Sequence, residues 1–423
     1  MFVRQVAILS SGTALAQMIA LGFLPFLTRL YSPQEFGAFA LYMAIASPLF
    51  ILGNSGFKEL IMLPHSNKIA AQFVQLTFLI SILVSSIVLF VTLVFDTQIS
   101  NIIVGKTNGD ADFTFLLYFL PFSILFFVNY QSFRFWFMRF ERYGIISSGQ
   151  VAKTTTNMLS AISIKIAKTT QLAGAGLVFA AILAELINLV WLLIRCGKKD
   201  RILFEQIKPK RLIVIVIRYK KMATSLTVSQ LIAALYTQLP NFIISAFFGL
   251  TTLGLYNIAE RIASAPALLI ANGVGDVYRQ RAAVQYRENG RFEKLMFKTM
   301  LTTTAIAIIP YSIGILFAPE IFSFVLGLEW EQAGKYASII LVGSFFGFIT
   351  TPVDKAAVIV KAHKFILLFN VLRLVLHTIA ALLVMLNILD LMSYIIALTA
   401  IRIMVYAIMT IRSWHYARGA KQS

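Results

Sequence analysis

Long apolar runs, separated by short polar segments, dominate the chain. A helix needs about 20 apolar residues to cross roughly 30 Å of hydrocarbon, and about twelve windows of this kind occur. Their approximate limits are residues 5–28, 35–57, 70–95, 113–135, 144–167, 171–194, 222–248, 251–277, 295–318, 332–354, 364–387 and 389–411. The fifth window is the most polar, because Lys153 and Asn157 lie near its centre. Strands of a membrane β-barrel alternate over about ten residues, so these longer, uniformly apolar runs predict an all-α integral membrane protein.

The composition agrees with this pattern. Of 423 residues, 59% are hydrophobic and 13% charged, against about 45–50% and about 25% in soluble domains. A water-soluble enzyme, a DNA-binding protein and a disordered chain are therefore excluded. The N-terminal apolar run exceeds the roughly 7–15 residues of a signal-peptide core, so we expect a first membrane span that is retained. The single Cys196 cannot form an intramolecular disulfide.

The net charge of +19 is mainly a signal of membrane topology. With the N-terminus inside, most lysines and arginines fall on the inner side, above all between Arg195 and Lys221, whereas acids such as Asp110 and Asp112 fall outside. This positive-inside distribution predicts cytoplasmic termini and an even number of spans. The stretch RLIVIVIRYKK within the basic segment could instead lie flat on anionic headgroups. Nothing in it indicates a nucleic-acid site.

A weak internal repeat divides the spans into two groups of six. EFGAFALYMAIASP, residues 35–48, is similar to TLGLYNIAERIASAP, residues 252–266. Transporters often contain such duplicated units. We therefore expect two pseudo-repeated six-helix lobes around a central cavity: residues 1–195, then a basic cytoplasmic connector at 196–221, then residues 222–423.

Charged residues within the spans are the candidate functional groups, because a charge in hydrocarbon costs a few kcal/mol even on lenient scales. Cations outnumber acids, as expected for a polyanionic substrate, and arginine makes charge-assisted bonds to phosphate oxygens. The predicted substrate-binding cations are Lys153, Arg261, Arg373 and Arg402, and the acids proposed for ion coupling are Glu185 and Glu260.

These residues also have structural interpretations. Gln150, Lys153, Asn157 and Ser160 share one helix face, which could line a water-filled cavity or a helix–helix interface. Asn257 shares a face with Arg261, and both Asn157 and Asn257 join the predicted binding set. Glu185 could pair with Lys153, and the two central arginines could pair with backbone carbonyls, Glu185 or Glu260.

The sequence lacks the motifs of several enzyme classes. There is no GxxxxGK[ST] loop for ATP, no HExxH or GxSxG pattern, and the four histidines are scattered. The longest outer loop, about residues 96–112, is too short to fold as a catalytic domain. We therefore expect no enzymatic activity, no metal site and no bound cofactor.

The segment Phe26–Phe57, with RLYSPQEFG at its first turn, resembles the start of Wzx-type polysaccharide flippases. LGLYNIAERIA, residues 253–263, is similar to the second-lobe segment of that family, within the superfamily of multidrug/oligosaccharidyl-lipid/polysaccharide (MOP) exporters. The motifs cover only some fifty residues, whereas the similarity in architecture covers the whole chain. Arg29 matches the family motif directly and is a further candidate at the outer edge of the site.

This resemblance implies a bacterial inner-membrane flippase for undecaprenyl-pyrophosphate-linked repeat units of O-antigen (lipopolysaccharide) or capsule. It implies alternating access driven by a proton or sodium gradient. The implied partners are the lipid-linked oligosaccharide, membrane lipids, and a polysaccharide polymerase with its chain-length regulator. One alternative is a MATE-type antiporter of cations or drugs, which would need acids in its cavity. A membrane-embedded glycan polymerase or transferase is the other.

Overall fold

The computed structural model describes residues 2–103, 111–167, 174–197, 200, 209–353, 356 and 363–419. Within these residues all regular structure is helical, which confirms the predicted fold class. Ten stretches of the described chain are long and apolar enough to cross a membrane, and one of them, Arg211–Asn289, covers both the seventh and the eighth predicted span. The fifth predicted span is a helix, Tyr143–Ile166, but its polar residues keep it out of that set.

Contacts divide the chain into two compact units, Met1–Thr251 and Thr252–Ser423. The predicted limits of the two lobes and the connector are not tested by this division and stay a prediction. The helices of unit 1 are α1 (Phe2–Gly22), α2 (Leu24–Leu30), α3 (Pro33–Asn54), α4 (Phe57–Leu60), α5 (Asn67–Ile103), α6 (Ala111–Leu117), α7 (Leu120–Arg139), α8 (Tyr143–Ile166), α9 (Ala175–Arg195) and the greater part of α11 (Pro209–Pro266).

Helix α11 passes from unit 1 into unit 2 and bends at Gly249, whose φ of 84° is in the left-handed region that favours glycine. Before the bend, α11 contributes Leu212 and Ala223 to the apolar core of unit 1. Gly56 permits this approach, since a Cβ there would lie only 2.4 Å from the carbonyl oxygen of Ala223.

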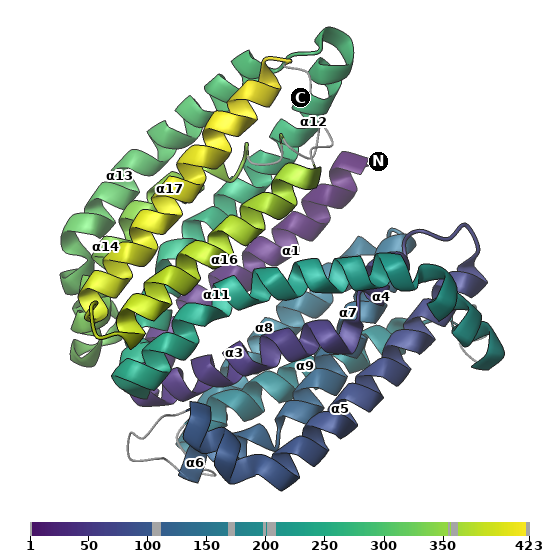
Figure 1. The fold of residues 1–423 in the computed structure, drawn as a ribbon, viewed down its shortest axis with the longest axis horizontal. Helices are drawn as coiled ribbons and strands as arrows, with labels where there is room; N and C mark the ends of the chain where they lie inside the picture. The colour runs from purple at the N-terminus through teal and green to yellow at the C-terminus, as the bar shows by residue number, and fades with distance from the viewer. Residues whose placement is uncertain are drawn as a thin grey trace. The chain divides into compact units, whose positions relative to one another are not determined.

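Unit 2 contains the end of α11, the π-helical turn Ala267–Ala271, α12 (Asn272–Asn289), α13 (Glu293–Leu326), the 3-10 turn Leu328–Trp330, α14 (Glu331–Thr350), α16 (His363–Met385) and α17 (Leu391–Ala417). Helices α13 and α14 pack along each other, and α14 packs on α17 (Figure 1). Small residues allow these close contacts: a Cβ at Gly334 of α14 would lie 2.5 Å from Cα of Pro319 in α13. Such packing of small residues is the usual basis of helix association in membranes.

Candidate functional site

The polar face of α8 contacts α9 through an ion pair. Lys153 Nζ donates a hydrogen bond to Glu185 Oε1, and the two side chains are only 22% and 12% exposed. Gly149, one turn before Lys153, lets α9 approach, since a Cβ there would lie 2.8 Å from the Asn188 Oδ1 atom. The interhelical pairing of Glu185 with Lys153 is therefore the arrangement that this sequence adopts.

The ammonium group of Lys153 also lies near two aromatic rings of α7. Its Nζ atom is 5.9 Å from the centre of the Phe127 ring and 5.7 Å from that of Tyr130. Aromatic faces attract cations at these distances. The Lys153 ammonium group is therefore attracted weakly by two aromatic rings and bonds to a single oxygen of Glu185.

Two polar atoms beside this pair, Glu185 Oε2 and Trp191 Nε1, have no hydrogen-bond partner in the described structure. Because a buried polar group without a partner is costly, such a group in a native protein indicates strain, a functional role, or a missing water or ion.

A polar cavity of about 250 Å³ opens next to Lys153. It lies among α1, α7 and α8, and its lining side chains include Thr13, Gln131, Arg134, Gln150 and Lys153. Two cations therefore share one intramembrane cavity with hydroxyl and amide groups. Such a set suits an anion, because charge-assisted hydrogen bonds are stronger than neutral ones.

Arg134 was not among the predicted site residues, because it was assigned to the inner polar segment that follows the fourth span. In the structure it is half-buried, and within the described residues it has no hydrogen bond or ion pair. Tyr130, Gln131 and Arg134 recur at helical spacing, and this polar stripe on α7 was the signal that could have identified it.

Asn157 lies one helical turn beyond Lys153 on α8 and is half-buried, but it does not line the cavity. Ser160 on the same face bonds back to the Thr156 carbonyl oxygen at 2.6 Å. Gln150 and Lys153 line the cavity, and Lys153 also pairs with Glu185 of α9. Ser160, farther along the same face, bonds within α8.

Unit 2 contains a second ion pair, between Arg402 of α17 and Glu260 of α11. One terminal guanidinium nitrogen lies 2.7 and 2.9 Å from the two carboxylate oxygens, and the other donates to Ser344 Oγ at 3.2 Å. Ser264 also donates to Glu260 Oε1, at 3.2 Å. Pairing of Arg402 with Glu260, one of the alternatives left open by the sequence, is observed.

A GxxxG pattern on α14 brings α17 close enough for this contact. A Cβ at Gly343 would lie 3.1 Å from Arg402 Cδ, and one at Gly347 would lie 2.9 Å from the Tyr406 ring. The two glycines therefore form a smooth surface against which Arg402 extends toward Ser344 and Glu260.

The other predicted residues of unit 2 lie on α11 and α16. Arg261 is half-buried and has no hydrogen bond or ion pair within the described residues. Asn257 bonds to the Leu253 carbonyl oxygen at 3.2 Å. Arg373 lies 4.7 Å from the centre of the Phe369 ring, and its carbonyl oxygen is 2.8 Å from His377 Nδ1.

The RLYSPQEFG turn has a clear structural role. Ser32 caps α3 and Glu35 bonds back to the Ser32 amide at 2.9 Å, so the two form a capping box. Lys165 of α8 pairs with Glu35 at 2.6 Å, and buried Tyr31 donates to the Ala161 carbonyl oxygen at 2.7 Å. Arg29 is exposed in the last turn of α2, away from these contacts.

Comparison with solved structures places this fold in a known class. The chain is similar to an inward-facing multidrug resistance MATE transporter of the MOP superfamily, with a TM-score of 0.71, 13% identity and 97% of each chain covered. It is similar to the lipid II flippase MurJ, with a TM-score of 0.72, 14% identity, and 97% of this chain and 89% of that one covered. It is also similar to a MOP transporter from Pyrococcus furiosus, with a TM-score of 0.57, 13% identity, and 97% and 94% covered.

The protein is therefore a multi-pass membrane protein with the MOP fold. Residues 2–278 match the model of the family described as "Polysaccharide biosynthesis protein", and the chain belongs to that family. The predicted relationship to Wzx-type flippases is confirmed at the level of the family and the fold. No curated protein sequence matches the chain.

Proposed function

We propose that this protein is a flippase that moves undecaprenyl-pyrophosphate-linked oligosaccharide repeat units, of O-antigen or capsule type, across the bacterial inner membrane. Membership of a polysaccharide biosynthesis family and the fold shared with the lipid II flippase MurJ support this assignment. The flipped product would then pass to a polysaccharide polymerase and its chain-length regulator.

The observation that carries the proposal is the cavity that contains both Arg134 and Lys153. Two cations beside hydroxyl and amide donors can neutralise a pyrophosphate and bond its oxygens, while an oligosaccharide needs only scattered polar contacts. A MATE-type site for cations would instead need accessible carboxylates. Here the two deep acids, Glu185 and Glu260, are each bonded to a cation.

We further propose that Lys153 couples transport to an ion gradient. Its ammonium group lines the cavity and also bonds to Glu185 Oε1, so a phosphate and Glu185 compete for the same cation. A buried carboxylate that loses its partner is strongly destabilised. A proton or Na⁺ at Glu185 would compensate for this loss, and the unpaired Glu185 Oε2 offers an oxygen atom for it. Binding of the anion and of the cation would then favour each other.

In unit 2 we assign a role in substrate contact to Arg261 and Arg373, of which Arg261 has no bonded partner among the described residues. The predicted coupling role of Glu260 would require the release of both carboxylate oxygens from Arg402. We therefore place ion coupling at Glu185.

The test uses a strain that lacks the gene and carries variants of it, with surface glycan as the readout and membrane protein level as the control. We expect Lys153→Gln with Arg134→Gln to reduce surface glycan at least about tenfold, because each removed charge-assisted bond contributes about 1.5–3 kcal/mol. Arg211→Gln, at an exposed cation of α11, is the matched control and should leave glycan unchanged. Normal glycan in the double variant would contradict the proposal.

Three further variants separate substrate contact from coupling. Arg261→Ala and Arg373→Ala should each remove surface glycan at normal protein level. In proteoliposomes, Glu185→Gln should remove the dependence of flipping on the imposed proton or sodium gradient. Unchanged ion dependence would exclude Glu185 from coupling.

A reporter fused after Ser423 tests the predicted topology. We expect a cytoplasmic signal, and a periplasmic signal would overturn that topology.

A further inference from the structure

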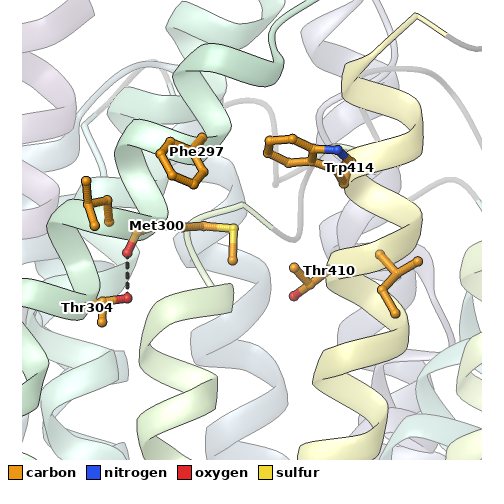
Figure 2. Close-up of a pocket in the computed structure, with 7 residues that line it drawn as sticks. Phe297, Met300, Thr304, Thr410 and Trp414 are labelled. Carbon is orange, nitrogen blue, oxygen red and sulfur yellow. Dashed lines mark hydrogen bonds between the residues drawn. The ribbon is translucent and has the colours of Figure 1, made fainter.

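An apolar slot of about 460 Å³ lies between α13 and α17 in unit 2 (Figure 2). Phe297 and Met300 of α13 face Thr410 and Trp414 of α17 across it. The rings of Phe297 and Trp414 stand edge to face with centres 6.3 Å apart. A volume of this size is within the range of small-molecule sites, about 300–1,000 Å³.

One polar group in the slot lacks a partner. Thr304 donates to the Met300 carbonyl oxygen at 2.8 Å, the bond drawn in Figure 2. The hydroxyl of Thr410, on the opposite wall, is buried without any hydrogen bond in the described structure. The slot thus presents one free donor in an apolar surrounding, which suits an alkyl chain that carries an ester oxygen.

Basic residues lie on both helices within about one turn of Phe297 and Trp414. Lys294 precedes Phe297 by three residues, and Lys298 follows it. Arg418 lies 5.4 Å from the Trp414 ring, and its Nε atom is 3.5 Å from Glu293 Oε2. Three cations and one carboxylate, the basic rim, therefore lie within about one helical turn of the two rings.

A backbone hydrogen bond joins the chain just before α13 to the end of α17 near these cations. The Phe292 amide donates to the Ala417 carbonyl oxygen at 2.9 Å, and both residues belong to a buried core with Met296. This hydrogen bond and this core fix the start of α13 next to the end of α17, where the cations lie. Trp414 lies between the basic rim and the apolar slot, the position that tryptophan prefers at a membrane–water interface.

We propose that this slot is a binding site for an anionic glycerophospholipid of the membrane leaflet on the basic side. One acyl chain lies between Phe297 and Trp414, an ester carbonyl accepts the hydrogen bond of Thr410, and the phosphate lies against Lys294, Lys298 and Arg418. Charge complementarity selects this occupant, because basic pockets between membrane helices favour anionic headgroups.

Quenching of Trp414 fluorescence by brominated acyl chains tests the proposal directly. The full-length protein is reconstituted in phosphatidylcholine vesicles with a small fraction of brominated phosphatidylglycerol or brominated phosphatidylcholine. Subtraction of the Trp414→Phe spectrum isolates the signal, and Trp136 and Trp330 are fully buried. We expect half-maximal quenching at an at least fivefold lower fraction of the anionic lipid, the effect of about one cation near a charged surface.

Matched variants show which residues cause this preference. Lys294→Gln with Lys298→Gln should remove most of it, whereas Arg281→Gln with Arg287→Gln, exposed cations of α12, should retain it. Thr304→Phe, which fills the slot, should weaken quenching by both lipids, and Ile309→Phe at an exposed site of α13 should not.

Three results would overturn the inference. Equal quenching by the two brominated lipids would show ordinary annular contact without a site. A preference for the anionic lipid that survives the loss of Lys294 and Lys298 would show that these lysines do not bind its phosphate. Undecaprenyl phosphate that displaces the brominated lipid at a lower fraction than phosphatidylglycerol would identify an isoprenoid as the occupant in place of a phospholipid.

Discussion

Two interhelical ion pairs, Lys153–Glu185 in unit 1 and Arg402–Glu260 in unit 2, are built differently. Lys153 bonds to one oxygen of Glu185 and leaves the other without a partner, beside a polar cavity. Arg402 contacts both oxygens of Glu260 and also bonds to Ser344. The Lys153–Glu185 pair is suited to separate, so that Lys153 can bind another anion. The Arg402–Glu260 pair instead joins α11, α14 and α17.

This difference follows from the chemistry of the two cations. The guanidinium group is a rigid plane with five donors, while an ammonium group is a compact charge on a flexible stem. Burial does not explain the difference, since the side chains of Arg402 and Glu260 are 27% and 29% exposed, against 22% and 12% for Lys153 and Glu185. The two ion pairs differ in the number of hydrogen bonds that the cation makes. Variants of both pairs test whether this number determines stability and function.

The largest effect on stability is expected from Glu260→Gln. It leaves the Arg402 charge without its carboxylate among three packed helices. Loss of one partner of a fully buried pair costs about 3–5 kcal/mol, which is the upper bound for this pair because its side chains are 27% and 29% exposed. Thermal unfolding of the purified protein should show a clearly lower midpoint. The double variant Glu260→Gln with Arg402→Met should recover part of the loss, and equal midpoints for wild type and Glu260→Gln would contradict a structural role.

The next effect concerns the glycine face beneath Arg402. Gly347→Ala places a Cβ 2.9 Å from the Tyr406 ring, so α14 and α17 must separate or distort. Overpacking of this kind costs about 1–3 kcal/mol. Gly144→Ala, where a Cβ meets nothing within 4 Å, is the control. A smaller aliphatic residue at position 406 should relieve the strain, and a neutral Gly347→Ala would show that the helices are not in tight contact.

An exchange of cations tests the comparison itself. Arg402→Lys should lower stability, because an ammonium group cannot span both Glu260 and Ser344. Lys153→Arg should leave stability within about 1 kcal/mol, the size of one ordinary hydrogen bond. It should nevertheless impair glycan export, since a guanidinium group can engage both Glu185 oxygens and releases them less readily. Full export by Lys153→Arg at normal protein level would argue against the release of Lys153.

The smallest effect is expected at Asp390, the exposed N-cap of α17. Hydrogen bonds from the Ser393 side chain and from backbone amides lower the pKa of this carboxyl group. The charged cap therefore stabilises the fold above the ordinary pKa of 3.8, and this contribution is lost as the pH falls through the lowered folded pKa. The difference in unfolding midpoint between wild type and Asp390→Asn should shrink below about pH 4. A difference that stays constant with pH would show that the charge of the Asp390 carboxylate does not contribute to stability.

Much of the fold was predictable because lipid imposes a simple rule on sequence. The predicted spans fall on helical residues wherever the structure describes them, although the seventh and eighth share one continuous stretch. Glu185 and Glu260 were identified as candidates because ionisable residues are rare in hydrocarbon. Arg134 was missed because a positive-inside count treats every cation near a helix end as a topology signal. Its place at a cavity depends on α8, which packs beside α7.

The sequence by itself determined an all-helical membrane protein with an excess of cations in its spans, because span length, hydropathy and charge are properties of consecutive residues. Only the tertiary structure decided which cation meets which acid. The Lys153–Glu185 contact joins residues 32 apart and the Arg402–Glu260 contact residues 142 apart. Helix packing set by single glycines such as Gly149 and Gly343 determines those distances, and a periodic pattern along one helix carries no information about its neighbour.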